Sequence, residues 1–270
     1  MEVGYSQQRR FVQAFTLVEL LVVIGIIVVL MGLMGPAMNA LKGANDVNKT
    51  VYDLASILEQ ARAYAVGNHT YVWVGIGEFD ASIDNSAKRQ KPGIGRLTVA
   101  VVASKDGTRR YEYTSANLDT PPWPTKDGAT LMAISKIQQF ENVHLAAPGV
   151  LNGSSASNNG VSVGVGAMIR PYLKSNSYVI ANGTSSVTQF DWPLGSQLGA
   201  GKYTFETVIN FDPKGAARIQ YATNNDGLYL YMEIGLMPTR GNTILTGPAA
   251  ANVAAIQINA ITGKARIYRP

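Results

Sequence analysis

The feature that most constrains this chain is an apolar segment from Phe15 to Met38 that contains a single charged residue, Glu19. A carboxylate at the centre of a membrane costs about 2.5–3.5 kcal/mol on insertion scales, so one inside such a segment needs a partner or a specific role. At about 1.5 Å per residue, Leu17 to Met38 is long enough to cross a hydrocarbon layer of about 30 Å. Arg9 and Arg10 precede it, which predicts a cytoplasmic N-terminus and an exported C-terminal part.

A second interpretation of these residues is a secretory signal peptide. Arg9-Arg10, the apolar core and Gly35-Pro36-Ala37 fit that pattern. The apolar segment is longer than a usual signal-peptide core, however, and Glu19 interrupts it. We therefore favour a helix that remains in the mature chain.

The helical pattern continues beyond the apolar segment. From Val47 onward, apolar residues recur at spacings of three and four, which predicts one stripe of an amphipathic helix. Gly67-Asn68 is a plausible C-terminal stop, so we expect a helix from about Leu17 to Val66. Pro36 is its weak point, because proline removes a backbone donor and clashes with the preceding turn.

The rest of the chain predicts β structure, with Gly-, Ser- and Asn-rich loops between short strands. The expected strands are 71–76, 96–102, 110–113, 203–209, 217–221, 228–232, 255–258 and 265–268, the last two joined as a terminal hairpin. The sequence thus predicts an α+β fold, in which a long N-terminal helix with a transmembrane lower half packs on a mostly antiparallel sheet.

Phe15-Thr16-Leu17-Val18-Glu19, after a short basic leader, resembles the cleavage and methylation site of type IV prepilins and type II secretion pseudopilins. The resemblance implies that a prepilin peptidase cuts between Ala14 and Phe15 and methylates the new amine of Phe15. Glu19, as the fifth mature residue, would neutralise the N-terminal amine of a neighbouring subunit or its own. Pro36 stands where pilins commonly carry a helix-kinking proline. The chain departs from the family in having Ala14 where glycine is usual.

Three later segments resemble minor pseudopilins of the GspH/FimT type, and they are Leu54–Ala65, Phe211–Gly215 and Thr262–Arg266. More narrowly, 61–64 running into 70–75, with the ending 267–270, is similar to the Verru_Chthon cassette protein D family. The resemblance implies a pilin-like organisation. Its expected parts are a leader (1–14), a transmembrane and assembly helix (15–38), an amphipathic continuation (39–67) and a β-rich globular domain (68–270).

The function that this resemblance implies is structural. The chain would be a minor pseudopilin of the inner membrane, with a single span and a periplasmic domain, that enters a type IV pilus or a type II secretion pseudopilus. Its partners would be the prepilin peptidase, other pilin subunits, the inner-membrane assembly platform and membrane lipid. The alternative is a membrane-anchored binding module, an adhesin or a minor pilin that captures DNA or a secreted substrate. A membrane-anchored exported enzyme is a further alternative, which the sequence disfavours.

Catalytic and metal-binding patterns find little support. The chain has no cysteine, which excludes disulfides and thiolate sites. Its two histidines, His69 and His144, are far apart, and neither has a metal-ligand pattern nearby. Asn224–Gly227 fits a tight turn better than a calcium loop. We therefore expect no enzyme activity, no cofactor and no metal.

Three further predictions concern single side chains. Arg62 should pair with Glu59 one turn away on the long helix. Trp73 alternates with valines and should be part of the core or of a sheet face. Trp123 and Trp192 stand beside prolines, and we expect them in loops, as the better candidates for contacts with partners.

Overall fold

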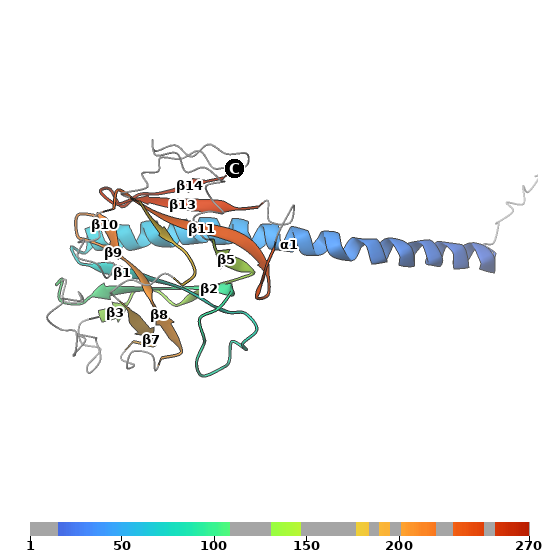
Figure 1. Cartoon of the computed structure of the whole chain (residues 1–270), viewed down its shortest axis with the longest axis horizontal. Coiled ribbons are helices and arrows are strands. Elements are labelled where there is room, and N and C mark those ends of the chain that lie inside the picture. The colour runs from blue at the N-terminus through green and yellow to red at the C-terminus, as the bar shows by residue number, and fades with distance from the viewer. Residues whose placement is uncertain are drawn as a thin grey trace, which may run out of the picture. The chain divides into compact units, whose positions relative to one another are not determined.

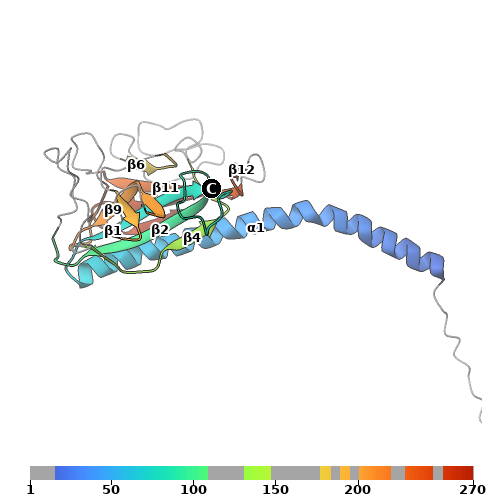
Figure 2. The same ribbon diagram turned by 90° about the horizontal axis from the view of Figure 1, so that it is seen from below.

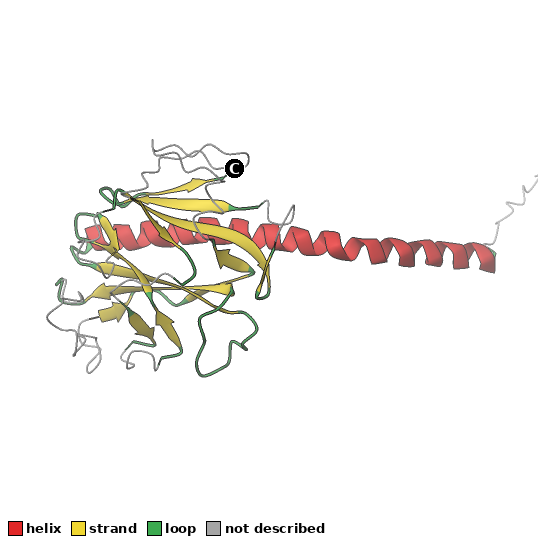
Figure 3. Ribbon diagram, in the orientation of Figure 1, coloured by secondary structure: helices red, strands yellow, loops and turns green. Residues whose placement is uncertain are grey.

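The computed structural model of this 270-residue chain describes residues 16–108, 131–146, 177–183, 189–194, 201–219, 229–245 and 252–269, without the side chains of 33–45. The described residues form one helix followed by 14 β-strands (Figure 3). The chain divides into two compact units, Met1–Lys42 and Gly43–Pro270. The first contains the beginning of the helix, and the second contains its remainder and all the strands.

Helix α1 comprises Leu17–Gly67. From Leu17 to Gly32 its side chains are apolar on all sides apart from Glu19, whereas from Val47 onward one stripe is buried and the opposite side is polar or exposed. The buried stripe consists of Val47, Val51, Leu54, Ile57, Leu58, Ala61 and Ala65. Among the described residues, no helix combines the length and the apolar character that crossing a membrane requires.

The first sheet has the strand order β10-β9-β1-β2-β3, and β4 also pairs with β2. All its pairings are antiparallel, and Figure 2 shows β9, β1 and β2 side by side. Its strands are β1 (Val72–Asp80), β2 (Gly95–Ser104), β3 (Leu131–Ala133), β4 (Gln138–Glu141), β9 (Thr207–Phe211) and β10 (Ala217–Ile219).

The second sheet has the order β12-β11-β13-β14, with β5 and β6 also paired to β11. Only the β6 pairing is parallel among those described in this sheet. Its strands are β5 (Val143–Leu145), β6 (Ser177–Ile180), β11 (Tyr231–Arg240), β12 (Thr243–Ile244), β13 (Ala254–Asn259) and β14 (Ala265–Tyr268).

The two sheets share one hydrophobic core with the second half of α1 (Figure 1). The buried helix stripe meets the inward residues of both sheets, such as Val74 of β1 and Ile256 of β13. Because each sheet covers part of the same stripe, the helix unites them into one domain.

A smaller core lies on the other face of the first sheet. It is covered by a two-stranded hairpin, β7 (Phe190–Trp192) and β8 (Tyr203–Phe205), whose aromatic side chains pack against Trp73 and Phe79 of β1. A side chain at Gly75 would place its Cβ only 2.6 Å from the ring of Phe190. Glycine is therefore required where this hairpin approaches β1.

One short segment belongs to both sheets. β4 pairs with β2 of the first sheet, and β5, which begins two residues after β4 ends, pairs with β11 of the second. The residue between them, Asn142, has a φ of 61°, which lies in the left-handed region that asparagine tolerates better than most residues. Its amide donates to Asp46 Oδ2 of α1 (2.8 Å), so the change of sheet is fixed against the helix.

The α+β class, the helix and the terminal hairpin are confirmed. The single strand expected at 203–209 is wrong, because the chain leaves one sheet and enters another at Glu206. The strand expected at 228–232 is placed too early, since β11 begins at Tyr231 and continues to Arg240. The strand expected at 110–113 lies outside the described residues.

Candidate functional site

The start of α1 is closed by a reciprocal capping box between Thr16 and Glu19. The Thr16 N–H donates to Glu19 Oε2 (2.8 Å), and the Glu19 N–H donates to Thr16 Oγ1 (3.2 Å). The Thr16 hydroxyl also donates to Glu19 Oε2 (2.8 Å). This arrangement satisfies two backbone donors that a helix start otherwise leaves unpaired, so Glu19 also defines where the helix begins.

The capping box places the carboxylate next to the predicted processing point. Ala14 and Phe15 lie outside the described residues. Phe15 directly precedes Thr16, so cleavage before Phe15 would create a free amine at Phe15. That amine would be one residue from the Thr16 N–H, which already donates a hydrogen bond to Glu19. An amine there would add a positive charge to the group of donors around the carboxylate, as the prepilin resemblance implies.

The helix surface that follows Glu19 is apolar and uncovered. Large hydrophobic side chains along the first turns are 43–78 % exposed. They are Leu17, Val18, Leu20, Leu21, Val22, Val23, Ile24, Ile26, Ile27, Val28, Val29, Leu30 and Met31. A helix that is apolar on every side is stable only when lipid or other protein surrounds it. This surface therefore requires lipid or other protein subunits to cover it, which a single copy in water does not have.

Pro36 lies within α1, and the helix continues through it. Its side chain lies outside the described part of the chain. The role of Pro36 in assembly stays a prediction.

A polar latch joins the second half of α1 to the turn between β13 and β14. Arg62 Nε donates to the Thr262 carbonyl oxygen (2.7 Å), and the Ala265 N–H donates to Glu59 Oε1 (2.7 Å). The predicted pair of Arg62 with Glu59 is present at 3.6 Å. The latch thus brings together parts of two of the segments that resemble GspH/FimT-type pseudopilins.

The third segment, Phe211–Gly215, also reaches the latch. A Cβ on Gly263, which has a φ of 64°, would lie 2.0 Å from the carbonyl oxygen of Gly215. A Cβ on Gly215 would in turn lie 3.3 Å from Arg62 Nε. The two glycines allow both turns to close on the helix, and this arrangement supports a structural role for these segments.

A buried ionisable cluster links the two sheets. Glu78 of β1 has no exposed side-chain area, and His144 Nδ1 of β5 lies 2.9 and 3.0 Å from its two carboxylate oxygens. The Gly95 N–H donates to Oε1 (2.9 Å) and the Leu145 N–H to Oε2 (3.1 Å). Every oxygen of this buried carboxylate is therefore hydrogen-bonded, as burial of a charge demands.

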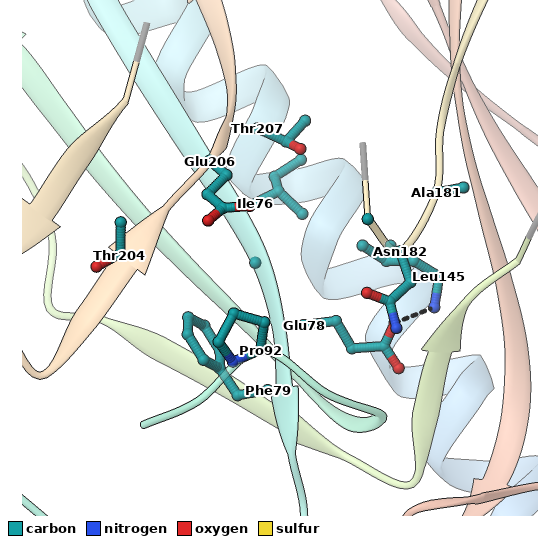
Figure 4. Close-up of a pocket in the computed structure, with 12 residues that line it drawn as sticks. Ile76, Glu78, Phe79, Pro92, Leu145, Ala181, Asn182, Thr204, Glu206 and Thr207 are labelled. Atoms are coloured by element: carbon teal, nitrogen blue, oxygen red, sulfur yellow. Dashed lines mark hydrogen bonds between the residues drawn. The ribbon is translucent and has the colours of Figure 1, made fainter. Parts of the chain in front are cut away.

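Figure 4 shows Glu78 reaching from β1 to the backbone of Leu145, beside a small pocket. Glu206, Asn182 and Thr207 also line this pocket. Within the described residues, no group of three or more His, Cys, Asp or Glu side chains could hold a metal ion. We assign the Glu78–His144 pair to the structural connection of the sheets. Sequence reasoning did not single out Glu78, although a glutamate within an apolar strand was a signal for it.

The remaining side-chain predictions have different outcomes. Trp73 is 1 % exposed and part of the core, as predicted. The loop position predicted for Trp192 is wrong, because this residue lies in β7 and packs against the smaller core. Trp123 lies outside the described residues, as does the turn at 224–227. His69 is an exposed loop residue with a φ of 49°.

The N-terminal part of the chain matches a known protein-family model. Residues 9–35 match the model of the prokaryotic N-terminal methylation motif. This motif confirms a prepilin-type N-terminus, supports the type IV prepilin and pseudopilin family, and indicates a protein that prepilin peptidase processes. The match covers 27 of the 270 residues, and it supports a structural subunit that is membrane-anchored, exported to the cell surface or periplasm, and assembled with other pilin subunits. No curated protein and no solved structure matches the chain.

Proposed function

We propose that this chain is a pilin-like structural subunit, a minor pseudopilin of a type IV pilus or a type II secretion pseudopilus. The prepilin peptidase cuts between Ala14 and Phe15 and methylates Phe15. The apolar first part of α1 anchors the chain in the inner membrane, and the β domain is exported to the periplasm. The observation that supports this most is a capped carboxylate, Glu19, at the start of an uncovered apolar helix surface, within the matched motif.

Assembly follows from the two requirements of that helix. Its apolar surface is covered first by lipid and then by the helices of other subunits, and this lateral packing supplies the free energy of polymerisation. Glu19 determines the axial register, since a buried carboxylate left without a positive partner costs about 3–5 kcal/mol. The methylated amine of Phe15, on the same or a neighbouring subunit, is that partner.

The first test is the mature N-terminus, measured by mass spectrometry of protein from native membranes. We expect a chain that begins with N-methylated Phe15. A chain that begins near Asn39 or Leu41 would indicate ordinary signal-peptide cleavage and refute the proposal.

The second test separates the charge of Glu19 from its helix cap. Glu19→Gln keeps an oxygen that can accept from Thr16 but removes the charge, whereas Thr16→Ala keeps the charge and removes the side-chain part of the cap. We expect Glu19→Gln to be processed but to lose incorporation into filaments by about a hundredfold, as a penalty of about 3 kcal/mol implies. Thr16→Ala should assemble. Equal incorporation of the Gln variant and the unmodified protein would contradict a register role.

A second candidate function is the capture of an external ligand by the β domain. It is favoured by a polar groove on the second sheet, which two exposed cations, Lys264 and Arg266, line. DNA and a secreted substrate are ligands that the sequence suggested. Binding to DNA that weakens steeply with salt would support that version, because counterion release dominates such affinity.

A further inference from the structure

The outer face of the second sheet carries a polar groove across β11, β13 and β14. Tyr231 stands opposite Asn259, and Gln257 stands opposite Arg266. Residues directly opposite each other project from the same face of a sheet, so these four side chains share one surface. The groove encloses about 320 Å³, a volume within the range of ligand pockets.

The groove stands on a rigid base. The opposite face of the same strands, with Ile234, Ile256 and Ile258, is buried against α1 in the main core. The latch also supports its β14 edge, because Arg62 binds the Thr262 carbonyl and Glu59 binds the Ala265 N–H. Side chains presented on such a scaffold lose little freedom when a ligand binds, which favours affinity.

The groove is positively charged. Lys264, directly before β14, and Arg266 of β14 are both exposed, and both line the groove. Within the part of the chain that the structure describes, neither forms an ion pair. Two cations without neutralising partners at one pocket select an anionic ligand.

The other lining groups are neutral and polar. Gln257 is only 4 % exposed, and its amide donates to the buried Glu233 (2.8 Å), so its orientation is fixed. Tyr231 and Tyr268 are half-buried and carry a phenol hydroxyl each. Tyr268 also packs against a small apolar cluster that includes Met237. Such a lining suits a ligand with many hydroxyl groups better than a lipid or an apolar peptide.

We propose that this groove binds an acidic polysaccharide that contains uronic acids. The planar guanidinium of Arg266 donates two parallel hydrogen bonds to a sugar carboxylate, and Lys264 adds a second positive charge. The amides of Gln257 and Asn259 and the two phenols face the sugar hydroxyls. This inference goes beyond assembly, since the ligand binds the β domain whether or not the subunit is in a filament.

A nucleic acid fits the same groove less well. Proteins that bind single strands combine a charged groove along several phosphates with aromatic rings that stack on successive bases. Here two cations line the groove, and Tyr268 is held against the apolar cluster. A polyuronate carries one carboxylate and several hydroxyls per sugar. These groups match the two cations and the neutral polar side chains of the groove more closely than a nucleic acid does.

The test is calorimetric binding of a short oligouronate to the full chain in detergent micelles. The variant Lys264→Gln/Arg266→Gln should bind at least about tenfold more weakly, as the loss of a charge-assisted bidentate contact implies. The matched control Lys88→Gln/Arg89→Gln removes the same charge from the exposed loop between β1 and β2. We expect it to bind like the unmodified protein. A neutral glucan of equal length should not bind.

Three outcomes would overturn the proposal. They are equal losses in both double variants, tighter binding of single-stranded DNA of the same charge, and no oligouronate binding at about 10 mM, where even millimolar affinity would be detected. Arg266→Lys keeps the positive charge but removes the planar guanidinium that makes two parallel hydrogen bonds. A circular dichroism spectrum confirms that this variant folds. This variant should still lose several-fold in affinity, and unchanged binding would refute the bidentate contact.

Discussion

Removal of either partner of the Glu78–His144 pair should destabilise the β domain strongly. Glu78→Ala leaves the N–H groups of Gly95 and Leu145 without their acceptor and opens a cavity in the core. His144→Ala leaves a fully buried carboxylate with backbone donors only among its described contacts. Both changes act where the first sheet meets the second, so both should lower the stability of the whole Gly43–Pro270 unit.

The expected magnitude follows from the burial of Glu78. Losing a hydrogen bond to a buried carboxylate typically costs about 1.5–3 kcal/mol. For a unit of this size, 1 kcal/mol lowers the melting temperature by about 2–4 °C, so each variant should melt about 3–12 °C lower. The double variant should lose less than the sum of the two single losses, with a coupling free energy of about 1–3 kcal/mol.

The assay is thermal unfolding of the full chain in detergent, followed by near-UV circular dichroism. His69→Asn is the matched control, because His69 is exposed and asparagine tolerates its positive φ. It should change stability by less than about 0.5 kcal/mol. The reasoning would be refuted if Glu78→Ala melted within 2 °C of the unmodified protein, or if the two losses were simply additive.

Three further predictions concern the latch and the end of β2. Arg62→Ala should cost about 1 kcal/mol in a denaturant titration, since it removes the hydrogen bond to Thr262. Gly263→Ala should cost clearly more than Gly183→Ala, because both glycines have a positive φ but only Gly263 faces a carbonyl oxygen at clash distance; equal losses would show that backbone strain alone decides. Hydrogen bonds from Thr108 and Ser104 lower the pKa of Asp106 from 3.8 to about 2. The ionised carboxylate therefore stabilises the fold above pH 4, and this stabilisation disappears as the pH falls through 2. Asp106→Asn should therefore lower the melting temperature at pH 6 and approach the unmodified protein near pH 2, whereas a constant difference would contradict this origin.

The helix and the terminal hairpin could be predicted because their signals are local. The amphipathic spacing after Val47 and the stop at Gly67 require no knowledge of distant residues. The turn before β14 is equally local, since Asn259, Thr262 and Gly263 form it within a few residues. Local periodicity was sufficient wherever the residues that define an element lie close together in the sequence.

The errors arise where distant contacts decide the structure. The alternating pattern is the same on both sides of Glu206, although Phe205 packs in the smaller core and Thr207 pairs with β1. β11 continues through Pro238, a residue that argues against a strand, because neighbouring groups pair around it. The Glu78–His144 pair joins residues 66 positions apart, and no local pattern indicates such a contact.

The register of β1 has a consequence for the order in which the domain forms. β1 lies at the start of the β domain, but its partner β9 is about 140 residues later, with Val72 opposite Phe211. At a synthesis rate of about 5–20 residues per second, β1 would wait about 7–28 s with one edge unpaired. Unpaired apolar edges invite aggregation, so we expect the free edge of β1 to be the point at which the unfinished domain aggregates until Phe211 has been synthesised.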